Sequence, residues 1–179
     1  LPDPAAAWSE LLRTVVQPER IAGEMNVTAD ALLRMIDRLA PLMTGLVGAS
    51  VTFSTIVSLL LGRWWQAMID RPGEFQREFH ALWLGRVAAS IAVVVGIGAA
   101  ATPVSLLDGL ALVALTLYLF QGLAVVHGLV RQRGMATGWL AGLYLLAVIL
   151  PLQVMVGLML VGIVDAWMDF RAQGGAGRE

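Results

Sequence analysis

The stretch that decides the fold class is GLALVALTLYLFQGLAVVHGLV, residues 109–130. None of its 22 residues is charged, and about 20 apolar helical residues are enough to cross the roughly 30 Å hydrocarbon core of a bilayer. Three further uncharged windows, of 23, 21 and 31 residues, occupy positions 39–61, 87–107 and 134–164. The sequence therefore predicts an all-α polytopic helical membrane protein, with about four transmembrane helices and additional amphipathic interfacial helices.

The composition supports this fold class. Apolar residues make up 58% of the chain and charged residues 14%, against about 25% charged residues in a soluble domain. Helices of a soluble bundle carry charge along one face, and the four windows carry none. The chain has no cysteine, which excludes disulfides, thiolate metal sites and cysteine nucleophiles. A net charge of −1 without a basic cluster disfavours nucleic acid as a partner.

Residues 1–38 are predicted to form an amphipathic interfacial segment. Apolar residues in its first half recur at the spacing of one helical face, and a second helix is expected to start near Thr28, a typical N-cap residue, and to continue into the first span at Pro41. The segment either senses lipid or gates access at the membrane surface, or it is a connecting helix packed on its own bundle, which we favour. The apolar face comprises Trp8, Leu11, Leu12, Val15 and Val16.

The transmembrane domain is predicted over residues 39–171, followed by a flexible tail at 172–179. The second span, rich in alanine and glycine, is expected inside the bundle. The fourth is too long for a perpendicular crossing at 1.5 Å per residue, so it must tilt, kink at Pro151, or break there into a re-entrant pair. Because the sequence starts at Leu1 without a signal-peptide pattern, we expect more protein upstream. The four spans are placed at about 39–61, 87–102, 106–130 and 139–167.

Arginines and tryptophans flank the predicted spans. The 62–86 connection is expected to form a surface helix at the headgroups. Alternating crossings place it on the same side as Arg131 and Arg133, with Arg34, Arg38, Arg171 and Arg178 on the other side. Six arginines against four favour a cytoplasmic 62–86 connection. The tryptophans within a few residues of a span end, as in an aromatic belt, are Trp64, Trp65, Trp83, Trp139 and Trp167.

A stripe of hydroxyl residues follows one face of the first span. Ser50, Ser54 and Ser58 stand at i, i+4 and i+8. Small hydroxyl residues allow another helix to approach closely, and the same stripe is compatible with a path for a hydrophilic solute. We favour close packing.

The sequence contains no recognisable catalytic motif, and we expect a protein that is not an enzyme and holds neither a cofactor nor a metal. The two histidines, His80 and His127, lie in different predicted elements without a carboxylate at metal-ligand spacing. His127 stands four residues before Arg131 near a membrane face. Snorkelling or an interhelical hydrogen bond is therefore a better explanation of His127 than a proton relay.

Polar residues at membrane depth are the candidate ligand-binding residues, because an unsatisfied polar group in hydrocarbon costs several kcal/mol. They either line a polar pocket for a solute or only tie helices together. The depths of spans three and four predict that Gln153 bonds to Tyr118 or Gln121 across a hairpin. The four candidates are Tyr118, Gln121, Tyr144 and Gln153.

Two aspartates end the last span at helical i, i+4 spacing. Asp165 and Asp169 could form an open, weak cation site. The alternative, which we favour, is an ordinary end-of-helix pair that answers Arg34 and Arg38.

Two short segments and the proline-interrupted last span carry a family resemblance. Gln121-Gly122-Leu123-Ala124-Val125-Val126-His127 is followed by Arg131-Gln132-Arg133-Gly134, and the chain then ends the span with Asp165-Ala166-Trp167-Met168-Asp169-Phe170-Arg171. Over roughly residues 39–171 this pattern resembles the C-terminal part of the YybS-like bacterial inner-membrane proteins, a family known mainly as a domain of unknown function. The family signature falls on Asp165, Trp167, Asp169, Phe170 and Arg171.

The resemblance implies a multi-pass protein of the bacterial inner membrane. The YybS-like family is similar in architecture to the S components of energy-coupling factor transporters, which bind vitamins or metal ions and work with an ATPase module. This implies a solute-binding membrane subunit, with the lipid bilayer and an ATPase or transmembrane coupling module as partners. The alternative is a non-transporting membrane scaffold or partner-binding protein.

Overall fold

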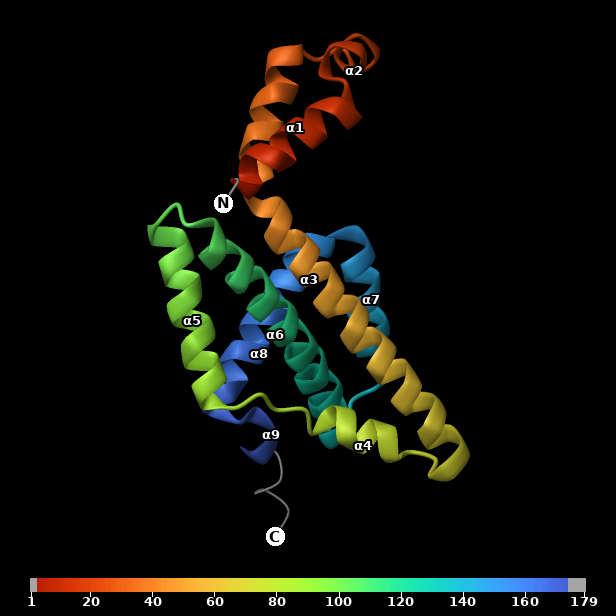
Figure 1. The fold of residues 1–179 in the computed structure, drawn as a ribbon. Coiled ribbons are helices and arrows are strands. Elements are labelled where there is room, and N and C mark those ends of the chain that lie inside the picture. Colours follow the sequence, from red (N-terminus) through yellow and green to blue (C-terminus); the bar gives the residue numbers. More distant parts are fainter. Residues whose placement is uncertain (1–2, 174–179) are drawn as a thin grey trace.

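A computed structural model describes residues 3–173, and these residues form an all-α structure (Figure 1). Three helices are long and apolar enough to cross a bilayer: α3 (Ala29–Asp70), α6 (Ser105–Gln132) and α8 (Pro151–Met168). Two shorter apolar helices, α5 (Arg86–Ala101) and α7 (Gly138–Ile149), accompany them. The all-α class is therefore confirmed. Long apolar helices are present at the positions of the first and third predicted spans and over the second part of the fourth.

Helix α3 is longer than the span predicted within it. It begins at the expected N-cap, where the Thr28 hydroxyl accepts a hydrogen bond from the Ala31 amide at 3.2 Å, and it continues through Pro41. At 1.5 Å per residue its 42 residues extend about 63 Å. Its N-terminal part projects beyond the rest of the bundle and carries α1 and α2 (Figure 1).

Helices α1 (Pro4–Val16) and α2 (Pro18–Met25) lie against the projecting part of α3. The Trp8 indole donates a hydrogen bond to the Thr44 hydroxyl at 2.9 Å, and Arg13 pairs with Asp37 at 2.8 Å. These contacts place α1 on the projecting part of α3. The predicted apolar face of α1 is only partly covered by α3, since Val15 is 71% exposed.

Helix α6 is the centre of the bundle, and it contacts α3, α5 and α8. Glycines allow backbones to touch where α6 crosses its neighbours. A Cβ added at Gly122 would lie 1.8 Å from the Leu158 carbonyl oxygen of α8, and one at Gly162 would lie 2.2 Å from that of Tyr118. The crossing of α6 and α8 therefore requires glycine at both positions.

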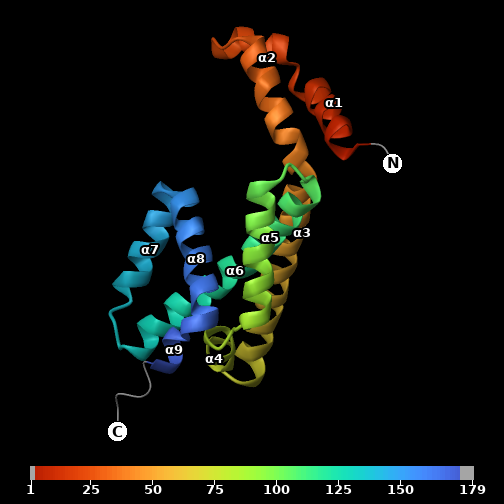
Figure 2. The same ribbon diagram turned by 90° about the vertical axis from the view of Figure 1, so that its left-hand side faces the viewer.

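The predicted fourth span is broken at Leu150 and Pro151, the third of the alternatives considered. Helix α7 ends at Ile149, and α8 starts at Pro151, where proline occupies the first turn and needs no amide partner. The two helices run in opposite directions side by side (Figure 2). The end of α8 consequently lies at the same end of the bundle as the end of α6.

Helix α5 corrects one expectation. It was predicted inside the bundle, yet it lies along the outside of α6, with Val87 76% and Val94 69% exposed. Only Ala89 of α5 is buried. Its contact side is narrow and centres on Ala89, and most of its valines and isoleucines are exposed.

The connection between α3 and α5 contains a short helix, α4 (Glu74–His80), as predicted. It follows a turn in which Gly73 has a φ of +88°, a conformation that favours glycine. Arg63 of α3 holds α4 through a two-pronged ion pair with Glu78, which lowers the pKa of that carboxyl. The predicted tail at 172–179 lies outside the described residues beyond position 173.

Candidate functional site

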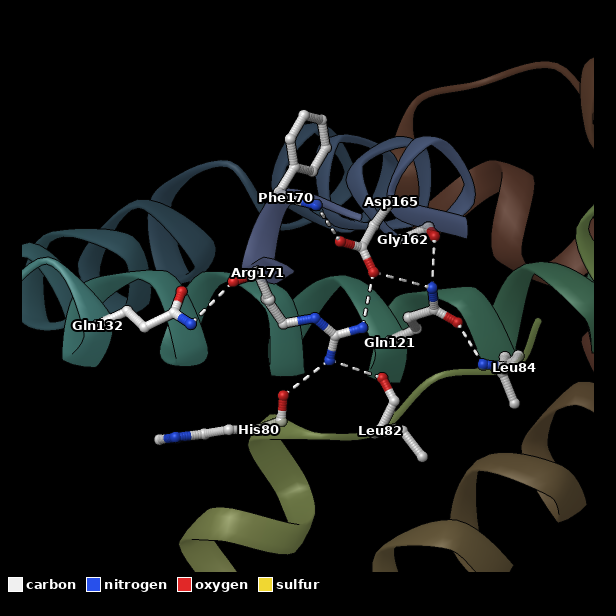
Figure 3. Close-up of polar contacts among 9 residues, drawn as sticks. All are labelled: His80, Leu82, Leu84, Gln121, Gln132, Gly162, Asp165, Phe170 and Arg171. Carbon is white, nitrogen blue, oxygen red and sulfur yellow. Dashed lines mark hydrogen bonds and ion pairs between the residues drawn. The ribbon is translucent and has the colours of Figure 1, made fainter. Parts of the chain in front are cut away.

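The most buried polar side chain of the central helix is Gln121, which is fully inaccessible to solvent. Its Oε1 accepts a hydrogen bond from the Leu84 amide at 2.9 Å, just before α5 begins. Its Nε2 donates to the Gly162 carbonyl at 2.9 Å and to Asp165 Oδ2 at 3.3 Å, both on α8 (Figure 3). Gln121 therefore ties α6 to two other parts of the bundle.

Asp165 is also fully buried, and Arg171 neutralises it. Its Oδ2 pairs with Arg171 Nη2 at 2.8 Å, and its Oδ1 accepts from the Phe170 amide at 3.1 Å (Figure 3). The prediction that Asp165 answers Arg34 and Arg38 is wrong. The break at Pro151 returns α8 to the opposite end of the bundle from those arginines (Figure 1).

Arg171 belongs to α9 (Phe170–Gln173) and completes the arrangement. Its Nη1 donates to the carbonyl oxygens of His80 at 2.7 Å and Leu82 at 2.9 Å, and its own carbonyl accepts from Gln132 Nε2 at 2.9 Å. We call Gln121, Asp165 and Arg171, with these partners, the Gln121 network. It joins the α4–α5 connection, α6, α8 and α9 at one end of the bundle (Figure 3).

The four candidate ligand-binding residues are not gathered in one place. Tyr118 is 2% exposed and packs with Ala89 and Ala166 in a small core. Tyr144 is 51% exposed on α7, and its hydroxyl lies 3.1 Å from Nε2 of His127. This contact is the interhelical hydrogen bond expected of His127, whose Nδ1 also lies 2.9 Å from a carbonyl oxygen of its own helix.

Gln153 does not bond to Tyr118 or Gln121, and that prediction is wrong. Gln153 is exposed in the first turn of α8, whereas Gln121 contacts Gly162, nine residues further along α8. Nine residues correspond to about 13 Å of helix. The prediction took equal depth to mean contact, whereas α8 meets α6 further along, at Leu158, Gly162 and Asp165.

The hydroxyl stripe of the first span faces outward. Ser50, Ser54 and Ser58 are all exposed, and α3 instead meets α6 at Gly45, where an added Cβ would lie 2.6 Å from the Gly109 Cα. Ser50 and Ser54 border a mostly apolar groove of about 460 Å³ that is also lined by residues of α6 and α8. The three serines are therefore not buried by close packing against another helix, which was the favoured explanation.

A second feature of this end of the bundle is a cleft of about 690 Å³, which we call the basic cleft. It lies between α4, the end of α6 and α9. Burial, together with the nearby charges of Arg131, His127 and Arg171, lowers the pKa of His80 in its wall. Sequence reasoning missed the cleft because the α8 reversal places Arg171 on the same side as Arg131. Its lining comprises Arg77, His80, Ala81, Trp83, Gly128, Arg131, Gln132, Asp169 and Arg171.

No protein-family model, curated protein or solved structure matches this chain. Within residues 3–173, no three His, Asp or Glu side chains come together in a way that could hold a metal ion. The function must therefore be argued from the bundle, the Gln121 network and the basic cleft.

Proposed function

We propose that the protein is a multi-pass membrane scaffold, a helical platform that presents its surfaces to the bilayer and to partners without transporting a solute. The observation that supports the proposal is that the buried polar side chains Gln121 and Asp165 are hydrogen-bonded within the chain. Gln121 and Asp165 form hydrogen bonds with the backbone and side chains of neighbouring elements (Figure 3). Contacts of this kind tie helices together and leave these polar groups engaged within the chain, as expected for a scaffold.

The exposed surface supports a bilayer location. Side chains such as Val148, Leu145 and Ile97 are 80%, 62% and 64% exposed on the two shorter apolar helices, and water would penalise so much exposed apolar area. The bacterial inner membrane is the location that the YybS-like resemblance implies. The tryptophans at the ends of helices are then an interfacial belt.

The arginines support one orientation. The ends of α3 and α6, the helices α4 and α9, and the start of α5 lie at one end of the bundle, and α1, α2 and the start of α3 lie at the other (Figure 1). By sequence, the first group of segments holds seven of the described arginines and the second holds four. The reversal of α8 brings Arg171 to the α4 end and so strengthens the bias. Cytoplasmic segments carry the excess of arginine. The α4 end comprises Arg63, Arg71, Arg77, Arg86, Arg131, Arg133 and Arg171, and the other end Arg13, Arg20, Arg34 and Arg38.

Cysteine labelling tests this topology, and the cysteine-free chain is a ready background. In intact cells, a membrane-impermeant maleimide is expected to label Pro103→Cys and Gln153→Cys but not Pro72→Cys, which should react only after permeabilisation. All three positions are exposed. Labelling of Pro72→Cys in intact cells would reverse the orientation. An unreactive Gln153→Cys beside a reactive Pro103→Cys would contradict the α7–α8 reversal.

One observation favours the second candidate function, a solute-binding subunit of a transporter. The hydroxyl of Tyr118 is buried and has no hydrogen-bond partner among the described residues. A buried hydroxyl without a partner costs about 1–3 kcal/mol, and a bound solute would supply that partner. The S-component architecture implied by the resemblance is consistent with such a role.

The variant Tyr118→Phe separates the two functions. In the scaffold, removal of an unpaired hydroxyl at constant shape is expected to leave the melting temperature unchanged or to raise it by about 2–4 °C, the equivalent of about 1 kcal/mol. The measurement is thermal unfolding in detergent, alone and with a panel of vitamins, nucleobases and divalent metals. A compound that stabilises the wild type but not Tyr118→Phe would favour the solute-binding subunit.

A further inference from the structure

We propose that the basic cleft binds the phosphate group of an anionic lipid headgroup. The cleft has about 690 Å³, within the 300–1,000 Å³ usual for ligand sites. Its lining brings three arginines together with Trp83. The proposal rests on the proposed membrane location, and it names a ligand that the scaffold function does not require.

The positive charge of the cleft is only partly neutralised within the described chain. Arg77 makes no ion pair with another described residue, and the hydrogen bond of Arg131 goes to the neutral Oε1 of Gln76 at 3.0 Å. Arg171 contributes a third guanidinium, which also forms an ion pair with the buried Asp165. Asp169 is the carboxylate among the lining residues. An excess of arginine over carboxylate, with planar guanidinium donors, suits a phosphate.

The cleft is a built site, because the Gln121 network fixes its walls. Arg171 holds the carbonyls of His80 and Leu82, which end α4 and start the α4–α5 connection. This wall lies directly against α6 at Gly128, where an added Cβ would be in ordinary contact with the His80 carbonyl oxygen at 3.6 Å. The arginines of α4 and α6 are thus held near each other before any ligand binds, which reduces the ordering cost of binding.

The position of the cleft favours a lipid as the source of the phosphate. Trp83 in its lining is 54% exposed, and Val87, 76% exposed, follows it on α5. An aromatic residue next to an apolar helix marks headgroup depth. Basic pockets between helices on the cytoplasmic side bind phosphate-bearing headgroups, and seven of the arginines lie at this end.

The test compares two double variants of the whole chain. Arg77→Gln with Arg131→Gln removes charge from the cleft, whereas Arg86→Gln with Arg133→Gln removes equal charge from exposed residues at the same end that do not line it. Native mass spectrometry of detergent-solubilised protein measures bound phosphatidylglycerol and phosphatidylcholine. At about 1 kcal/mol, or about fivefold, per arginine, the cleft variant should bind phosphatidylglycerol about 25-fold more weakly. The matched control should change less than threefold or so.

Equal weakening in both double variants, or equal binding of the two lipids, would overturn the proposal. Binding of inorganic phosphate distinguishes a lipid headgroup from a free phosphate compound as the ligand. Inorganic phosphate should bind more weakly than phosphatidylglycerol because it has no acyl chains. If it binds as tightly and depends on Arg77 and Arg131, a free phosphate compound is the ligand and the lipid source is overturned. Cysteine labelling reports the membrane topology separately, so failure of the scaffold proposal is distinguishable from failure of this one.

Discussion

Gly122→Ala is expected to prevent α6 and α8 from packing. The new Cβ would lie 1.8 Å from the Leu158 carbonyl oxygen, a backbone atom that can move only if the two helices separate. Overpacking of a rigid contact costs about 3 kcal/mol or more, which corresponds to a melting temperature lower by about 6–12 °C. Separation would also lengthen the hydrogen bonds of Gln121 to Gly162 and Asp165. Thermal unfolding in detergent measures the effect.

Gly157→Ala is the matched control, because Gly157 lies on α8 next to Leu158 but has nothing within 4 Å of an added Cβ. Alanine is preferred to glycine in a helix interior by up to about 1 kcal/mol, so this variant should be as stable as the wild type or slightly more so. If Gly122→Ala and Gly157→Ala melt at the same temperature, the backbone contact of α6 with α8 does not exist as described.

Arg171→Ala is expected to have the second large effect. It would leave the fully buried Asp165 without its ion-pair partner, and it would release the carbonyls of His80 and Leu82. Removal of one partner of a buried ion pair costs about 3–5 kcal/mol. The melting temperature in detergent should fall by about 6–20 °C.

The comparison for Arg171→Ala is Arg13→Ala, which removes an ion pair whose two side chains are 50% and 54% exposed. Exposed pairs contribute about 0–1 kcal/mol, so Arg13→Ala should be nearly silent. The double variant Asp165→Asn with Arg171→Gln removes both buried charges and should recover part of the lost stability. Equal effects of Arg171→Ala and Arg13→Ala would show that the buried pair does not hold this end of the bundle together.

Helix positions could be predicted from the sequence, since they depend on local runs of residues. The uncharged window at 109–130 lies within α6, and Thr28 is the N-cap of α3 as expected. Pro151 marked the break in the fourth window, but a tilt, a kink and a reversal have the same local signature. Only contacts with α6 select the reversal, through Gly162 and its partner carbonyl.

The candidate site was predictable only in part for the same reason. Gln121 stood out as a polar residue at depth, and the Asp165 to Arg171 segment was singled out by resemblance. Their pairing joins residues 44 positions apart in the chain, and Leu84 joins from 37 positions away. No periodicity encodes such distances. The error on Gln153 arose because depth alone does not say which residues of α8 face α6, and the contacts are made by Gly162 and Asp165 instead.

The place of Arg171 also sets an order of assembly. The α4–α5 connection is synthesised before α6, α7 and α8, and the guanidinium that holds its His80 and Leu82 carbonyls follows about 90 residues later. Contacts of such long range form slowly, because the intervening chain must first be arranged. We therefore expect the α4–α5 connection of the nascent bundle to stay loosely packed until α7 and α8 have both been inserted. A chain that stops at Asp169 would contain every long apolar helix, but it would lack the Arg171 hydrogen bonds that hold the His80 and Leu82 carbonyls.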